Sequence, residues 1–171
     1  MGQIQNAISG AVSTAVGAQV ASELKTQRET KALASDVGKV ADLIEDYKKS
    51  EDTFINDAKK MTAPMRQNSE LSNLSAEQFA DMAKKNNPEV LKADQALQRE
   101  YDNIMTWKNR IQGRLDSLKR RNAHDLDLEI SIKDANKRIG AVEASRGNVW
   151  DRVRRNTGEF NNQTNQEGGQ Q

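Results

Sequence analysis

The chain has 171 residues, of which 35% are hydrophobic, 30% charged and 4% aromatic. A typical domain is about 45–50% apolar with glycine counted. This chain can therefore bury only a thin core, which favours long helices with narrow apolar faces. The net charge of +1 excludes a general attraction to nucleic acid or acidic substrates. The absence of cysteine excludes disulfides and thiolate metal sites.

Residues 2–24 are mostly small, β-branched or polar, and carry no charge before Glu23. Residues four apart form a ridge on a helix. Most of the surface beside this ridge is Ala, Gly, Ser or Thr, which allows another helix to approach closely. We therefore expect a helix that packs in a homo-oligomer or larger assembly, or enters a membrane as several associated copies. The ridge consists of Ile4, Ile8, Val12, Val16, Val20 and Leu24.

The same segment lacks two signals of membrane targeting. It has neither the basic region nor the dense apolar region of a secretory signal. No run of 18 strongly apolar residues is present, so an ordinary transmembrane helix is not expected.

The next stretch, "ELKTQRETKALASDVGK", is charged and either continues the helix or breaks it near Ser35 or Gly38. From Val37, apolar residues recur at alternating spacings of three and four, which predicts a coiled-coil-like seam. Glu51 interrupts this seam, and Pro64 ends the helix. The seam consists of Val37, Val40, Ile44, Tyr47, Phe54, Ala58 and Met61.

After Pro64, "APMRQNSELSN" is typical of a loop. Ser75 and Gln78 have the spacing of a capping box, and Leu74 and Phe79 that of a hydrophobic staple, so a short helix is predicted over residues 76–85. Asn87 and Pro88 then begin a long helix that extends to about Arg121. Its seam consists of Leu97, Tyr101, Ile104, Ile111, Leu115 and Leu118.

"RRNAHD" predicts a turn, and the segment after it fits two patterns. Residues 124–133 alternate as in a strand, yet the spacing from Leu128 to Val153 also fits a helix. We interpret it as a helix, because no neighbouring segment offers a pairing strand. The fold class is therefore all-α: elongated helices with a coiled-coil-like hairpin after Pro88, on which the helix from Val37 can dock. The predicted units are 1–34, 35–63, 64–155 and a disordered, Gln/Asn/Gly-rich tail, 156–171.

Signals of catalysis or metal binding are missing from the sequence. His124 is the single histidine and has no nucleophile pattern around it, so a solvated or capping side chain is expected. Asp125, Asp127 and Glu129 lack the central glycine and terminal glutamate of a calcium loop. No phosphate-binding loop is present. We expect neither an enzyme nor a cofactor.

Basic residues form two clusters, one at the C-terminal end of each of the two long helices after Pro88. Cations at helix C-termini stabilise the helix macrodipole, and the same residues are candidates for contacts with DNA phosphates. In an antiparallel hairpin these two ends point in opposite directions, so the clusters would not form one patch. The candidate nucleic-acid contacts are Arg114, Lys119, Arg120 and Arg121, with Arg152, Arg154 and Arg155 in the second cluster, beside Trp150.

The run "IQNAISGAVSTAVGAQVAS", followed by "ELKTQRETKAL", resembles the N-termini of bacteriophage internal virion proteins. Two groups share this layout: the ejection proteins of short-tailed phages and the DNA pilot proteins of small tail-less phages. The resemblance covers mainly residues 2–34 and is compositional. It implies a virion protein that leaves with the genome and helps to form a conduit across the host envelope. The heptads depart from that pattern, because Pro64 and Pro88 interrupt them.

Our leading expectation is a non-enzymatic phage structural protein that oligomerises through its heptad seams and meets the host membrane through residues 2–24. Its expected partners are further copies and other virion proteins, with phage DNA and the host membrane as candidates. One alternative is an architectural adaptor, plug or minor component without membrane activity. Another is a DNA-binding packaging protein that uses the arginine clusters.

Overall fold

The computed structural model describes the backbone of residues 2–155 and the side chains of residues 17–155. Within this range every regular element is a helix, which confirms the all-α class. Of the segment 124–133, residues from Leu126 onward are helical as predicted, and His124 and Asp125 precede the helix. The tail 156–171, predicted to be disordered, lies outside the described residues. The helices are α1 (Gly2–Met61), α2 (Ala63–Gln67), α3 (Ser69–Ser72), α4 (Ala76–Asn86), α5 (Pro88–Arg120), α6 (Leu126–Gly147) and α7 (Val149–Arg154).

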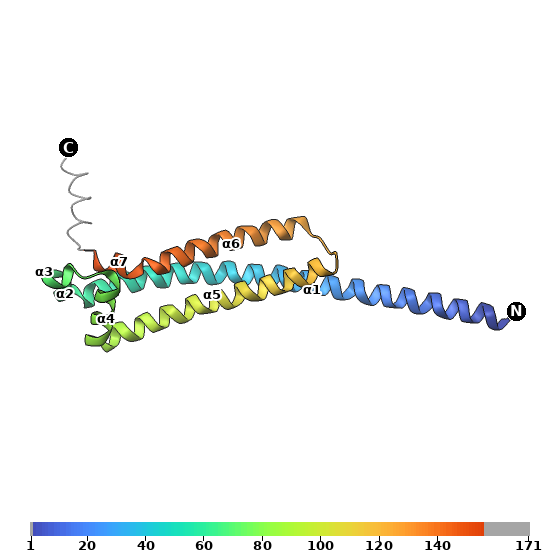
Figure 1. Cartoon of the computed structure of the whole chain (residues 1–171), viewed down its shortest axis with the longest axis horizontal. Coiled ribbons are helices and arrows are strands. Elements are labelled where there is room, and N and C mark those ends of the chain that lie inside the picture. Colours follow the sequence, from blue (N-terminus) through green and yellow to red (C-terminus); the bar gives the residue numbers. More distant parts are fainter. Residues whose placement is uncertain (1, 156–171) are drawn as a thin grey trace, which may run out of the picture.

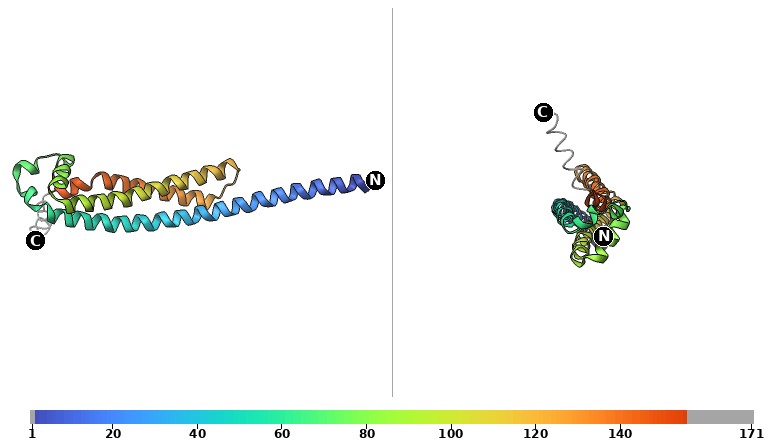
Figure 2. Two further views of the ribbon diagram at one scale, coloured as in Figure 1. Left: turned by 90° about the horizontal axis from the view of Figure 1, so that it is seen from below. Right: turned by 90° about the vertical axis from the view of Figure 1, so that its left-hand side faces the viewer.

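The second half of α1 packs lengthwise against α5 and α6, which also pack against each other (Figure 1). α5 and α6 form the predicted antiparallel hairpin, and α1 runs in the same direction as α6. At one end of this bundle, α4 packs on α5 and α7, and α7 contacts α1. At the other end, α1 continues alone well beyond the α5–α6 turn (Figure 2).

α1 is a single uninterrupted helix of 60 residues. It spans both segments, 1–34 and 35–63, with no break at Ser35 or Gly38, because no proline occurs before Pro64. The predicted loop over "APMRQNSELSN" is wrong in part, because α2 and α3 lie within it. Pro64 occupies the first turn of α2, where its missing N–H costs nothing, and the Asn68 side chain accepts from Glu70 N at 3.0 Å.

Local end signals define the remaining helices. The capping box is confirmed: Gln78 N donates to Ser75 Oγ, and Ser75 N donates to Gln78 Oε1, both at 3.1 Å. Asn87 accepts from the first turn of α5, and Asp125 from Leu128 N of α6. α5 ends in a Schellman motif around Asn122, whose φ is 56°.

The core consists of the heptad positions of these helices facing one another. The α5 seam continues from Val90, and the α6 seam keeps spacings of four and three through α7. These side chains fill the inside of one chain, so the seams have partners within it, and oligomerisation through them stays a prediction. The buried apolar seam residues include Leu33, Val40, Ile44, Tyr47, Phe54, Leu97, Ile104, Ile111, Leu118, Leu128, Ile132, Ile139, Val142, Val149 and Val153, with Val37, Tyr101 and Leu115 partly buried.

Candidate functional site

The projecting segment is residues 2–25 of α1, which extend past the bundle (Figures 1 and 2). All side chains from residue 17 to residue 25 are exposed, and Thr26 is the first that is partly buried. Two ridge residues are described: Val20 is 50% exposed and Leu24 is 48% exposed. The other four, Ile4, Ile8, Val12 and Val16, lie on the α1 backbone, but their side chains are outside the described residues.

The bundle stops at Thr26 because α5 and α6 are too short to reach further. Their turn packs beside α1 at Thr26 and Thr30, which share a small pocket with Ala123 and His124. His124 is mostly exposed, with Nδ1 3.5 Å from Glu129 Oε1. At about 1.5 Å per residue, the projecting segment is roughly 36 Å long.

Across the described residues, no helix has the length and apolar character needed to span a bilayer. The same residues contain no group of three or more His, Asp or Glu side chains arranged to hold a metal ion.

The first basic cluster mostly holds α5 to α1. Arg114 Nε lies 3.1 Å from Asp36 Oδ2, which Arg110 Nε approaches at 3.7 Å. Arg121 lies 3.6 Å from Glu29. Within residues 17–155, only Lys119 and Arg120 of the four predicted DNA contacts in this cluster have no ion pair.

The second cluster has a similar structural role at the opposite end of the bundle (Figure 1). Arg152 Nη1 donates to Glu51 Oε1 at 2.8 Å. Arg154 donates to Leu74 O at 2.7 Å and to Asp151 Oδ1 at 2.8 Å, while Arg155 contacts Asp151 Oδ2 at 3.2 Å. The hydrogen bond from Arg154 is the main cause of a lowered pKa of Asp151. The two clusters remain separate, as the hairpin topology requires.

Glu51 belongs to the core and does not break the seam, contrary to its sequence interpretation. It is buried, accepts from Arg152 and contacts Ser145 Oγ. Tyr47, one turn earlier, is 1% exposed. Burial first, and then the neighbouring Glu51 carboxylate, raise the pKa of the Tyr47 hydroxyl far above its ordinary value. A paired charge is thus built into the α1 seam.

Asp94 is a second buried charge that the sequence analysis did not identify. Its Oδ1 accepts from Arg146 Nη2 at 3.1 Å and from Trp150 Nε1 at 3.0 Å. The Trp150 ring packs edge-on against Phe54, with centroids 5.6 Å apart, so it is not available to stack on a base. The heptad register was the signal that could have found this pair, because Asp94 and Arg146 occupy seam positions of α5 and α6.

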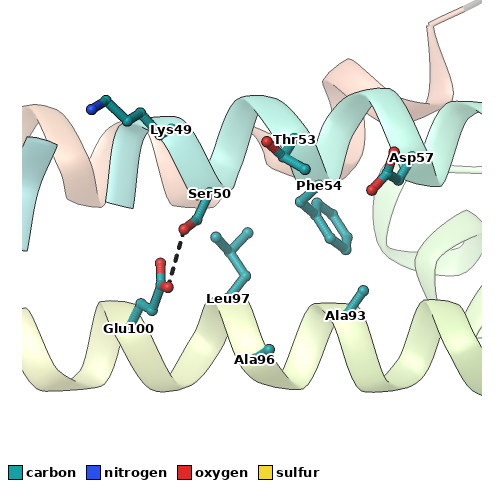
Figure 3. Close-up of a pocket in the computed structure, with 9 residues that line it drawn as sticks. All are labelled: Lys49, Ser50, Thr53, Phe54, Asp57, Ala93, Ala96, Leu97 and Glu100. Carbon is teal, nitrogen blue, oxygen red and sulfur yellow. Dashed lines mark hydrogen bonds between the residues drawn. The ribbon is translucent and has the colours of Figure 1, made fainter. Parts of the chain in front are cut away.

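Two shallow grooves run along α1. One, of about 350 Å³, lies against α5, where Phe54 and Leu97 point toward each other and Ser50 Oγ donates to Glu100 Oε1 at 3.0 Å (Figure 3). The other, of about 390 Å³, lies against α6 and is lined by Val37, Ala41, Ile44, Ile130, Ser131, Asp134, Ala135 and Arg138.

Comparisons of the chain with protein-family models, curated proteins and solved structures return no significant match.

Proposed function

We propose that this chain is a non-enzymatic structural protein of a bacteriophage particle, of the internal or ejection type. It associates through its projecting segment and helps to deliver the genome across the host envelope. The observation that carries the proposal is the division of α1: the half from Thr26 packs into a bundle, while residues 2–25 extend beyond α5 and α6. A long helix rich in small residues, whose described side chains, residues 17–25, are all exposed, needs partners to be stable.

The ionisable side chains support a structural role. Asp94, Glu51 and Asp36 each meet at least one arginine from another helix, and these contacts hold the bundle in register. The DNA-packaging alternative has less support, because Arg114, Arg121 and the second cluster are already engaged within the chain.

The second candidate is an architectural adaptor that never meets a membrane. The polar Ser, Thr and Gln residues of the projecting segment favour it, because these side chains are costly against lipid. In both candidate functions the bundle is a rigid body, and the projecting segment makes the contact with other molecules.

Dye release from vesicles of phosphatidylethanolamine and phosphatidylglycerol separates the two. The full chain is expected to release dye, and the full-length double variant Val20→Asp/Leu24→Asp to lose most of this activity. Leu91→Asp, which changes an exposed leucine of α5, is the matched control and should release dye like the unaltered chain. Intact vesicles at every protein concentration would remove the envelope role and leave the adaptor.

A further inference from the structure

The exposed ridge of the projecting segment leads into the surface of the bundle between α1 and α5. Residues four apart form one row on a helix, and this row continues from Val20 and Leu24 to Arg28. Its next two positions are Ala32 and Asp36, and Asp36 contacts an arginine of α5. The two exposed apolar side chains therefore lie on the same winding row that reaches the contact between α1 and α5.

The part of α1 beside this row carries cations. Arg28 and Lys39 are eleven residues apart, which is about three helical turns, so both lie on one face of α1. Asp36 borders that face, because it lies three residues before Lys39. All the cations are exposed, and none has an ion pair within residues 17–155: Lys25, Arg28, Lys31 and Lys39.

α5 adds a cation and an aromatic ring to the same surface. Arg110 reaches toward α1, where its Nε lies 3.7 Å from Asp36 Oδ2. In spite of this contact, 52% of the Arg110 side chain is exposed. Its guanidinium carbon lies 4.9 Å from the centre of the Trp107 ring, and Trp107 is only partly buried. A cation stacked on a tryptophan thus faces outward beside the cations of α1.

The acids of this surface do not cancel its charge. Asp36 is buried and paired with arginines of α5, and Glu29 lies 3.6 Å from another arginine of that helix. Glu23 precedes Lys25 by two residues, a turn of about 200°, and so lies on the opposite side of α1. Asp42 is the next acid along α1 and ends the surface toward the middle of the helix. The surface is therefore net positive.

The outer face of α6 at the same end of the bundle differs in charge. Unpaired residues of both signs alternate along it, with Asp127 and Asp134 beside Lys133 and Lys137. A large anionic partner is therefore attracted to the side formed by α1 and α5, and not to α6.

A membrane that contains anionic lipids matches all three features of this side. The apolar ridge can enter the boundary of the acyl chains, and the cations can meet the headgroup phosphates. Tryptophan is favoured at the level of the headgroups, because its ring is apolar and its N–H is polar. The phosphates of a nucleic acid would also attract the cations, but they would leave Val20 and Leu24 without an apolar partner.

We infer that this cationic surface binds the headgroup phosphates of anionic lipids, with α1 lying along the membrane surface and α6 turned away from it. The inference rests on the proposed function, which brings the chain to an envelope, and it adds which side of the bundle meets the lipid. The cationic surface consists of Lys25, Arg28, Lys31, Lys39, Arg110 and Trp107.

Flotation of the full-length chain with vesicles tests the role of charge. The unaltered chain should float with vesicles that contain phosphatidylglycerol, float less with pure phosphatidylcholine vesicles, and lose binding as salt is raised. The surface variant Lys25→Gln/Arg28→Gln/Lys39→Gln should bind phosphatidylglycerol vesicles about tenfold to a hundredfold more weakly.

A matched control removes the same charge from other faces of the molecule. The control variant Lys85→Gln/Lys133→Gln/Lys137→Gln should bind like the unaltered chain. All the positions changed in the two variants are exposed and lack an ion pair within residues 17–155, so the bundle should fold, which circular dichroism checks.

Tryptophan fluorescence tests which side faces the lipid. Phosphatidylglycerol vesicles with a nitroxide on some headgroups should quench the emission of the unaltered chain. Trp107→Phe should abolish most of this quenching, because Trp150 packs against Phe54 at the other end of the bundle. Quenching that persists in Trp107→Phe would show that another side meets the membrane.

Three results of the flotation experiment would overturn the inference. They are equal binding to both kinds of vesicle, equal loss of binding in the surface and control variants, and a surface variant that loses binding to duplex DNA but not to vesicles. Dye release separates the inference from the proposed function. A chain that binds vesicles through this surface and never releases dye would keep the inference and remove the envelope role. A chain that releases dye while its surface variant binds undiminished would do the reverse.

Discussion

Residues 26–61 of α1 and the projecting segment form one helix. The part from Thr26 packs against α5 and α6, whereas the described side chains of the projecting segment, residues 17–25, are all exposed. In the packed part, apolar residues alternate between spacings of three and four, so a straight seam faces α5 and α6. In the projecting segment the ridge spacing is strictly four. Each step of four residues turns the ridge by about 40° around the axis. The ridge therefore winds around the helix, which suits a crossing helix or several surrounding copies.

The largest expected effect on stability comes from removing a buried charge from the bundle. Asp94→Ala leaves Arg146 buried and unpaired and removes the acceptor of Trp150 Nε1. We expect a loss of about 3–5 kcal/mol in the free energy of unfolding, measured by urea denaturation. Asp116→Ala, at an exposed position of the same helix, should change it by less than about 0.5 kcal/mol. Equal midpoints for the two variants would show that Asp94 is not a core residue.

Two leucines of α1 give a matched pair across the two regions. Leu33 is 0% exposed, whereas Leu24 is 48% exposed. Leu33→Ala should lower the free energy of unfolding by about 3 kcal/mol, because a cavity forms in the core. Leu24→Ala should change the monomer by less than about 0.5 kcal/mol. A large loss for Leu24→Ala at concentrations where the chain is monomeric would mean that the projecting segment packs on its own bundle.

Alkaline stability should report mainly on the bundle, because Glu23 and Lys25 are the only ionisable side chains among residues 2–25. Tyr47 keeps its proton in the folded chain far above the ordinary tyrosine pKa of about 10, so the unfolded chain binds fewer protons there. Its contribution to stability is complete below about pH 10 and decreases above it, by up to about 1.4 kcal/mol per pH unit. Urea titrations between pH 9 and 11 should show a steeper fall for the unaltered chain than for Tyr47→Phe. Parallel curves would contradict this account of Tyr47.

The smallest expected effect is a gain in stability. Gly113 lies inside α5, and an added Cβ would meet no atom within 4 Å; the same is true of Gly17 in the projecting segment. Gly113→Ala should therefore raise the free energy of unfolding by about 0.5–1 kcal/mol, because alanine favours the helix. Gly17→Ala should raise helicity by circular dichroism but leave the urea midpoint of the monomer unchanged. A shift of that midpoint by Gly17→Ala would show that the projecting segment and the bundle unfold together.

Sequence patterns predicted the local elements well, because each carries its own signal. The Ser75–Gln78 box, the Asn87–Pro88 start and the three-and-four spacing after it all act over a few residues. Glu51 and Asp94 were missed because a polar residue in a seam resembles an interruption until its partner is known. The sequence also could not predict which helices pack against each seam. The heptad spacing is the same whether the seam packs against a second copy or against helices of its own chain. The α1–α6 groove depends on the rotation of α6, which no local pattern specifies.

Hydrogen exchange along α1, at a concentration where the chain is monomeric, tests most directly whether the projecting segment lacks a partner in its own chain. We predict protection close to that of global unfolding for amides between Leu33 and Ala58, and weak protection between Gly10 and Lys25, since an isolated helix of this composition is marginally stable in water. Protection of the Gly10–Lys25 amides should rise only when copies associate. Equal, strong protection of both stretches in the monomer would contradict the account.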